Sequence, residues 1–293
     1  MKNFDYIAAK SIGEAIALLS QGGKVMAGGT DLIVEMRDRA MQPGKVIDLK
    51  KIPGLDYLEY RDGEGLRLGA LARIRDIETS KVIREKFWLL SEAAGYLGSV
   101  QVRNRATVGG NLCHATPSAD MAPALIGLGA MVRYSGAGGE KVLPLEDFFQ
   151  GPGKTVLQGD EILTEIRVPE MGRYTDGVYL KFSPRRAMDL AVVGVASVLT
   201  TDKTGSKCEE IRIVLGAVAP VPMRAKKAEE VLRGKKLNET LIREAGKVAS
   251  QEAKPITDIR ASEWYRRQIV EELTVRTVQQ AWERIRARVE GGK

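Results

Sequence analysis

Two pairs of adjacent glycines, each at the end of a short apolar run, constrain this chain more than any other feature. Gly28 and Gly29 follow residues 25–27, and Gly109 and Gly110 follow residues 106–108. We expect each segment to form a strand, a glycine turn and then a helix start or a loop. Glycine adopts positive φ and lets backbone amides approach a ligand with no side chain between them, and successive amides in such a turn form a concavity that binds anions. Two turns from distant parts of the chain therefore predict a diphosphate held from both sides, as in a dinucleotide cofactor.

Neither glycine pair belongs to a common phosphate-binding motif. Both lack the G-x-G-x-x-G spacing, and no lysine follows Thr30 as it would in a P-loop, so the sequence disfavours phosphoryl transfer. Each pair taken alone could equally be a structural turn. The polar residues after the second pair favour a binding site, since Asn111 and Asp120 can form hydrogen bonds with phosphate, ribitol or sugar oxygens. The alternative for Asp120 is a carboxylate that only stabilises a helix N-terminus.

The excess positive charge does not point to a nucleic acid. The chain has 293 residues, enough for one large or two ordinary domains, and a formal net charge of +7. Acidic residues interrupt the basic ones, as in residues 226–230, and there is no zinc-finger spacing, RNP-type strand or long basic block. We therefore expect solvated helix faces, with an acidic partner protein as an alternative.

Cysteine and histidine are too few for a metal centre held by this chain alone. Cys113 and Cys208 lie far apart, which excludes a disulfide framework and a four-thiolate iron–sulfur cluster. His114 is the only histidine, so a histidine-rich metal site is excluded too. The opening residues lack the apolar core of a signal peptide, and no segment is long enough to cross a membrane. We expect a cytoplasmic protein.

The order of the predicted elements indicates an α+β fold with two domains. After the turn-rich residues 169–177 come three strands, near residues 178–182, 190–199 and 211–217, and then three helices, near residues 223–232, 239–253 and 261–286. Strands followed by helices argue against a doubly wound parallel sheet. We place one domain at residues 1–172 and the other at residues 173–293.

Four segments give the chain a resemblance to a known family. In order they are AGGTDL, QVRNRATVGGN, SADMAPAL and LKFSPRRAMDLAVV. They resemble the FAD-binding medium subunit of molybdenum hydroxylases, the family of xanthine dehydrogenase and carbon monoxide dehydrogenase, over roughly residues 1–285. The resemblance implies a two-lobed FAD-binding domain of the vanillyl-alcohol-oxidase (PCMH) type, in which both lobes are α+β. A small α+β domain, with a three-stranded sheet and helices, follows it.

The resemblance also implies which residues contact FAD. One side of the diphosphate would be wrapped by Val25, Met26, Ala27, Gly28, Gly29, Thr30, Asp31 and Leu32, and the other side by Thr107, Val108, Gly109, Gly110 and Asn111. The remaining contacts would come from Asp120 to a polyol or sugar hydroxyl, from Leu97 and Leu163 to the flavin or adenine, and from Lys181 near the isoalloxazine ring.

Several side chains keep alternative readings. Lys181 could instead be an exposed strand lysine, and Tyr174 and Tyr179 could either cover the flavin ring or pack in the core. The resemblance implies no role for Cys113 or His114. It implies no catalytic side chain either, because the flavin would carry the chemistry while the protein binds and tunes it.

The implied function is electron transfer within a larger complex. A large molybdenum-cofactor subunit would hydroxylate a substrate, the [2Fe–2S] clusters of a small subunit would relay the electrons, and this chain would pass them through FADH₂ to NAD⁺ or another acceptor. We expect a dimer of heterotrimers, with the molybdenum cofactor and the clusters only in the partners. One alternative is a stand-alone FAD-dependent oxidase, or a reductase of the cell-wall-precursor type. Another is a nucleic-acid-binding or scaffold protein.

Overall fold

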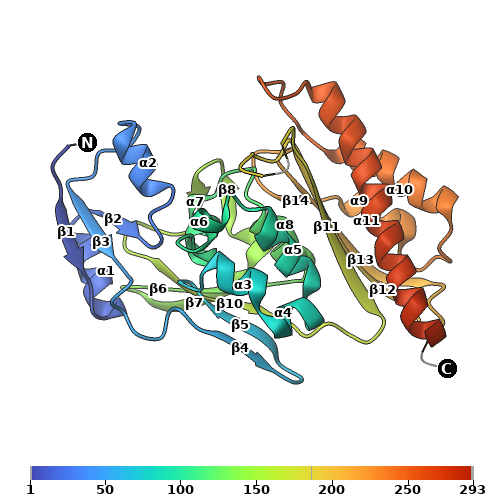
Figure 1. The fold of residues 1–293 in the computed structure, drawn as a ribbon, viewed down its shortest axis with the longest axis horizontal. Helices are drawn as coiled ribbons and strands as arrows, with labels where there is room; N and C mark the ends of the chain where they lie inside the picture. The colour runs from blue at the N-terminus through green and yellow to red at the C-terminus, as the bar shows by residue number, and fades with distance from the viewer. Residues whose placement is uncertain (1, 186, 292–293) are drawn as a thin grey trace.

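The computed structural model describes residues 2–185 and 187–291, which form two lobes and a C-terminal domain (Figure 1). The first lobe is a three-stranded parallel sheet in the order β1-β3-β2 with two helices. Its elements are β1 (Asp5–Ala8), α1 (Ile12–Ser20), β2 (Lys24–Met26), α2 (Leu32–Arg37) and β3 (Lys45–Asp48). Within the described residues, no helix combines the length and the apolarity needed to cross a membrane.

Local sequence signals account for the first lobe. Ser11 caps α1 by accepting a hydrogen bond from the amide of Glu14 at 3.1 Å, and Gly22, with a φ of 89°, follows the end of the helix. Ala15 and Leu19 of α1 are buried together with Ile47 of β3. Apolar residues four apart thus attach the helix to the sheet.

The second lobe is a five-stranded antiparallel sheet with helices along it. The sheet order is β4 (Leu58–Arg61), β5 (Gly65–Gly69), β10 (Ile162–Val168), β6 (Met131–Gly136) and β7 (Gly139–Pro144). The helices are α3 (Ile74–Thr79), α4 (Lys81–Lys86), α5 (Trp88–Tyr96), α6 (Val100–Arg103), α7 (Val108–His114) and α8 (Met121–Gly127). A short 3-10 turn, η1 (Leu145–Asp147), leads into the small hairpin of β8 (Phe149–Gly151) and β9 (Lys154–Thr155).

The C-terminal domain has the predicted order of strands followed by helices. Its antiparallel sheet runs β11 (Thr175–Phe182), β12 (Val193–Thr201), β13 (Cys208–Gly216) and β14 (Met223–Arg224). The helices are α9 (Lys226–Leu232), α10 (Glu239–Glu252) and α11 (Glu263–Gly291). The sequence predicted the three long strands but not the two-residue edge strand β14, which occupies the first positions assigned to a helix.

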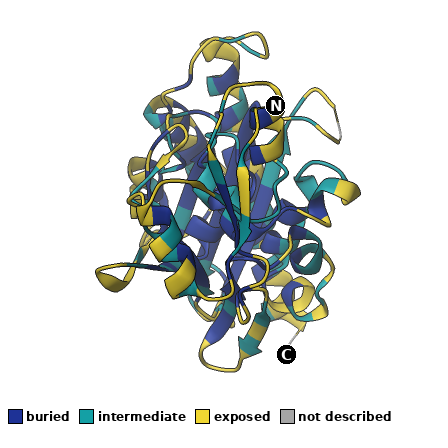
Figure 2. Cartoon of the chain, turned by 90° about the vertical axis from the view of Figure 1, so that its left-hand side faces the viewer, coloured by how far each residue is buried: buried dark blue, intermediate teal, exposed yellow. Residues whose placement is uncertain are grey.

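The C-terminal sheet is buried on both faces. Because successive residues of a strand point to opposite sides, Val195 of β12 belongs to the core shared with the C-terminal helices, whereas Ala196 and Val198 belong to the core of the second lobe. Figure 1 shows the sheet between α5 and α8 on one side and α9 to α11 on the other. Seen from the first lobe, the buried residues run through the middle of the molecule and the exposed ones cover its loops and outer helices (Figure 2).

The prediction of a strand before the second glycine pair is wrong. Gly109 and Gly110 lie in the first turn of α7, and neither has positive φ. Thr107 caps this helix, because its hydroxyl accepts a hydrogen bond from the amide of Gly110 at 3.1 Å. A threonine at this position is a helix-start signal that outweighs the β propensity of Val108.

Candidate cofactor-binding site

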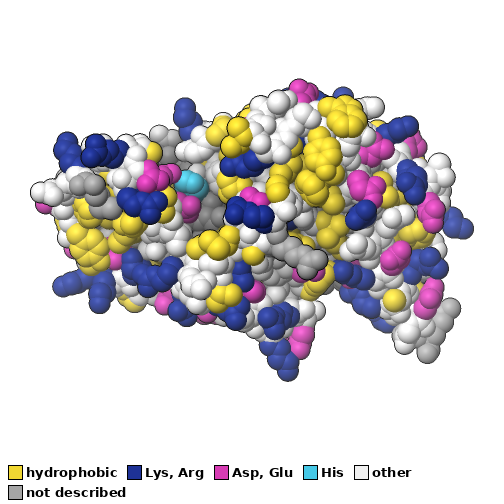
Figure 3. Space-filling model, turned by 45° about the horizontal axis from the view of Figure 1, so that its top comes forward, with side chains coloured by type: hydrophobic (Ala, Val, Ile, Leu, Met, Phe, Trp, Pro, Cys, Tyr) yellow, Lys and Arg dark blue, Asp and Glu magenta, His cyan; other side chains and the backbone are white. Residues whose placement is uncertain are grey.

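A cleft of about 970 Å³ runs between the two lobes and reaches the loop that joins β11 to β12. Its walls come from the turn between β2 and α2, from α7, and from β10. Figure 3 shows the single histidine, His114, at the surface where the cleft opens. Segments far apart in the sequence therefore meet here, as expected for a site that holds an extended ligand.

The first glycine pair forms the turn between β2 and α2, and backbone packing sets its position. A Cβ atom on Gly28 would lie 2.1 Å from the carbonyl oxygen of Arg105, so only glycine lets the turn rest against the chain that leads into α7. Gly29 has a φ of 77°, a conformation that side chains disfavour. Lys50 fixes the turn from behind, since its Nζ donates to the carbonyl of Ala27 at 3.0 Å and to Asp48 at 2.8 Å.

The amides of this first turn are available to a ligand. Within the described residues, the amides of Gly28, Gly29, Thr30 and Asp31 donate no hydrogen bond to the protein. All four residues line the cleft. Successive unpartnered amides around a glycine turn form a concavity suited to an anion such as a diphosphate.

The second glycine pair contributes in a different way, because its amides already have partners. The amides of Val108 and Gly109 donate to the carbonyls of Ala72 and Ala70, at 3.0 and 2.9 Å. A Cβ atom on Gly109 would lie 2.6 Å from the carbonyl oxygen of Ala70. The second pair therefore packs α7 closely against the end of β5.

Asn111 offers the polar group that α7 does present to the cleft. Its side chain lines the cleft, and its Oδ1 atom is buried without a hydrogen-bond partner among the described residues. Buried polar atoms are normally satisfied. An unpaired one in a cleft wall indicates that a ligand completes the site.

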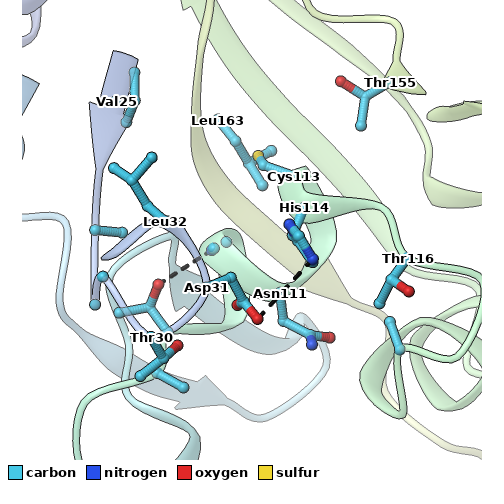
Figure 4. A pocket seen from close by; sticks show the side chains of 18 of the residues that line it. Val25, Thr30, Asp31, Leu32, Asn111, Cys113, His114, Thr116, Thr155 and Leu163 are labelled. Atoms are coloured by element: carbon cyan, nitrogen blue, oxygen red, sulfur yellow. Dashed lines mark hydrogen bonds and ion pairs between the residues drawn. The ribbon is translucent and has the colours of Figure 1, made fainter. Parts of the chain in front are cut away.

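Acidic and basic side chains approach each other across the opening. His114 of α7 lies 4.0 Å from Asp31 and 3.7 Å from Glu35, which belong to the first lobe. Figure 4 shows Asp31 and His114 facing each other, with Asn111 beneath them. This contact joins the two walls of the cleft.

A buried carboxylate forms part of the cleft floor. Asp120 accepts hydrogen bonds from the Tyr179 hydroxyl at 2.8 Å and from Lys181 Nζ at 2.9 Å, and both donors lie on β11. Lys181 Nζ also donates to the carbonyl of Tyr96 at 3.2 Å. Burial raises the pKa of the Asp120 carboxyl, and the ammonium of Lys181 opposes that shift.

Apolar side chains complete the wall at α7 and β10. Figure 4 shows Leu163 and Cys113 close together there. Burial raises the pKa of the Cys113 thiol to about 12, so this side chain is a neutral, weakly polar contact at physiological pH and not a nucleophile. Such a surface suits a flat aromatic ring system.

Comparison with known protein families identifies the family to which the chain belongs. Residues 2–171 match a family model described as the FAD-binding domain in molybdopterin dehydrogenase, and residues 178–281 match one described as the CO dehydrogenase flavoprotein C-terminal domain. The chain belongs to this FAD-binding family of molybdopterin dehydrogenases.

Individual relatives match this chain over nearly their whole length. The medium chain of glyceraldehyde dehydrogenase from Sulfolobus acidocaldarius is 34% identical over 93% of this chain and 96% of its own. The carbon monoxide dehydrogenase medium chain of Hydrogenophaga pseudoflava is 34% identical over 96% and 98%. A solved carbon monoxide dehydrogenase structure from the same organism superposes with a TM-score of 0.93 at 34% identity, covering 97% of this chain and 98% of that one. The chain is thus the FAD-binding medium subunit of an oxidoreductase of the molybdenum hydroxylase type.

Most of the predicted site residues of this family member line one cleft. Of the seventeen, fourteen do so: Val25, Ala27, Gly28, Gly29, Thr30, Asp31, Leu32, Leu97, Thr107, Gly109, Gly110, Asn111, Asp120 and Leu163. The other three lie behind its walls. Met26 packs beside Leu32, Val108 is fully buried, and Lys181 lies behind Asp120.

The cleft residues that sequence reasoning missed include two groups from segments outside the glycine turns. The first is the small hairpin, which contributes Gln150, Lys154 and Thr155, and the second is the β11–β12 loop, which contributes Met188, Asp189 and Leu190. The Gly151-Pro152-Gly153 turn signalled the hairpin in the sequence, but no pattern indicated that it closes the cleft. The second group belongs to a segment that supported the family resemblance, of which only Lys181 had been assigned to the site.

Proposed function

We propose that this chain holds the FAD through which electrons from the [2Fe–2S] clusters of a partner subunit reach NAD⁺ or another acceptor. The observation that carries the proposal is the cleft with four unpartnered amides in one turn and an unpaired Asn111 oxygen opposite them. When bound, FAD supplies redox chemistry, since it exchanges electrons singly or in pairs. Within the described residues, no group of three or more His, Cys, Asp or Glu side chains is placed to hold a metal ion.

The residues of the cleft fit this cofactor. We assign the amides of residues 28–31 to the diphosphate, where unpaired N–H groups offset its negative charge. The unpaired Oδ1 of Asn111 would accept a hydrogen bond from a hydroxyl group of FAD, while its amide nitrogen can donate to a phosphate oxygen. Asp120 keeps lone pairs free of Tyr179 and Lys181 and can accept a polyol or sugar hydroxyl.

The other assignments concern the ring systems and the domains. Leu97 and Leu163 exclude water from the flavin or adenine, and Lys181 acts through Asp120 by favouring its ionised form.

We place the boundary between the FAD-binding domain, residues 1–172, and the C-terminal domain, residues 173–293, in the turn before β11. We further propose a complex with a large molybdenum-cofactor subunit and a small [2Fe–2S] subunit, assembled as a dimer of heterotrimers.

Electron delivery to the loaded chain tests the proposal. The small [2Fe–2S] subunit is reduced with dithionite, and the excess dithionite is removed by desalting under anaerobic conditions. The reduced subunit is then mixed with the FAD-loaded chain while the flavin absorbance is followed. We expect the flavin absorbance to fall, and then to recover on addition of NAD⁺ or of a quinone. Apoprotein that takes up no FAD, or a loaded chain whose flavin does not respond to the reduced clusters, would refute the proposed function.

A further inference from the structure

Two segments of the C-terminal domain carry six exposed large apolar side chains. They come from the β11–β12 loop and from the first turn of α11 with the residues before it, and we call them the apolar patch: Met188, Leu190, Ile256, Ile259, Trp264 and Tyr265. Ile259 is 99% exposed and Trp264 is 68% exposed. Figure 3 shows hydrophobic side chains gathered on the upper surface of this domain, on the same face as the cleft opening. Contiguous exposed apolar surface of this kind marks an interaction site.

The loop that carries Ile259 is held in place by hydrogen bonds. The Asp258 carboxylate accepts from the amides of Arg260 and Ala261, at 2.8 and 3.2 Å, and from Arg266 Nη2 at 2.8 Å. The Asp258 amide donates to the carbonyl of Ala261 at 3.1 Å. These bonds fix the conformation of the loop in which the Ile259 side chain is exposed. A rigid apolar anchor binds a partner with little loss of conformational entropy.

The two halves of the patch are joined to each other. Arg266 is buried, and its Nη1 donates to the carbonyls of Val192 and Ala217, at 2.6 and 3.1 Å. The ring of Tyr265 stacks edge-on against Phe182 at the end of β11, with 5.8 Å between the ring centroids. The start of α11 and the β11–β12 loop thus form one continuous surface.

The patch reaches the cofactor cleft. Met188 and Leu190 belong to the patch and also line the cleft, and the amide of Met188 donates to the carbonyl of Gly98 in the cleft wall at 3.4 Å. A protein seated on the patch would cover the edge of the cleft. This position suits a partner that exchanges electrons with the cofactor, whereas a partner that only binds substrate has no need to reach it.

We propose that the apolar patch is the docking surface for the electron-donating [2Fe–2S] subunit, with Ile259 and Trp264 as its anchors. This inference rests on the proposed function, because it names the surface through which that electron transfer occurs. Large apolar anchors at the centre of an interface carry most of its binding energy. A charge placed on either anchor should therefore weaken this contact without changing the cofactor site.

Co-purification of the complex tests the docking surface. Ile259→Lys and Trp264→Lys are each introduced into the tagged chain, which is expressed with its [2Fe–2S] and molybdenum subunits. The matched control is Val142→Lys, which changes another half-exposed apolar residue, on β7 outside the patch. We expect each patch variant to retain at least tenfold less [2Fe–2S] subunit per chain than wild type, with full FAD content. The control should retain both.

The outcomes separate the docking proposal from the function. If both patch variants keep the [2Fe–2S] subunit at the wild-type ratio, the docking proposal is wrong. It is also wrong if they lose only the molybdenum subunit, or if they only abolish self-association of this chain. A wild-type chain that binds FAD but never retains a [2Fe–2S] subunit would instead refute the proposed function itself.

Discussion

Gly28 has no side chain because one segment of backbone passes directly over another there. The carbonyl oxygen of Arg105 occupies the space where its Cβ would be, so the two glycine-containing segments touch through their backbones. The sequence pattern predicted a glycine turn here and favoured ligand approach as its reason, with a purely structural turn as the alternative. That contact could not be foreseen, because it depends on a carbonyl more than seventy residues away along the chain.

Gly28→Ala should therefore destabilise the fold. Overpacking against backbone should lower the free energy of unfolding by about 3 kcal/mol, as measured by denaturant unfolding of the apoprotein. Gly13→Ala is the control, since that glycine lies in α1 and a Cβ atom added to it would meet no atom within 4 Å. It should raise the free energy of unfolding by about 0.5–1 kcal/mol. Equal stability of Gly28→Ala and wild type would contradict the contact.

Asn111→Asp should weaken FAD binding while leaving the size and shape of the side chain nearly unchanged. The new carboxylate repels the diphosphate in a cleft where water screens charge poorly, so we expect the Kd for FAD to rise at least tenfold. Titration of the apoprotein with FAD, followed by flavin fluorescence, measures it. Asn104→Asp makes the same change outside the cleft and should leave the Kd unchanged. An unaltered Kd for Asn111→Asp would remove this residue from the site.

At the scale of elements, short-range patterns predicted most of the fold. The capping residues and apolar spacing of α1, and the apolar runs of β12 and β13, are local signals that the sequence contains. The helix α7 was misread because a buried seven-residue helix has no visible period, and its amides find their acceptors at residues 70 and 72. Which glycine turn leaves its amides unpaired is thus decided by tertiary contacts.

Thr107→Val should loosen α7 by removing its cap. The hydroxyl that accepts from Gly110 is replaced by a methyl group of similar size, and loss of an N-cap lowers the free energy of unfolding by about 1 kcal/mol. Chemical denaturation should show the lower free energy of unfolding. Titration with FAD should show a higher Kd. Thr107→Ser keeps the hydroxyl and should behave like wild type. If the valine and serine variants prove equally stable, the cap contributes nothing.

At the scale of the whole molecule, a group of buried and half-buried charges joins the second lobe to the C-terminal domain. The Arg284 guanidinium lies 3.8 Å from the centroid of the Trp88 ring, and Trp88 Nε1 donates to the carbonyl of Gly177 at 2.7 Å. Burial raises the pKa of Glu92 to about 7, opposed by Arg284 and reinforced by Asp176. Tyr96 also faces Glu92. One carboxyl at this junction is therefore poised to titrate near neutral pH.

Glu92 should make the stability of the chain depend on pH. Its pKa is about 7 in the folded protein, against 4.5 for a glutamate exposed to water in the unfolded chain, so the folded state binds more protons between these values. The contribution of Glu92 to stability is therefore full below pH 4.5 and is lost as the pH rises through 7.

Glu92→Gln should remove this pH dependence. Thermal unfolding at pH 5 and pH 8 should show a Tm advantage of the variant over wild type that grows with pH. The exposed Glu85→Gln should match wild type at both values. A Tm difference between Glu92→Gln and wild type that stays constant from pH 5 to pH 8 would show that Glu92 does not titrate in this range.

Asp120 belongs to one half of the chain, yet the Tyr179 hydroxyl and the Lys181 ammonium that donate hydrogen bonds to it come from the other half. Exchange of either half alone for one that lacks these partners would leave an uncompensated carboxylate in the floor of the cleft. Viable hybrids should consequently carry Asp120, Tyr179 and Lys181 together or replace all three. The two halves occupy separate stretches of the sequence, but we expect substitutions at these three positions to occur together.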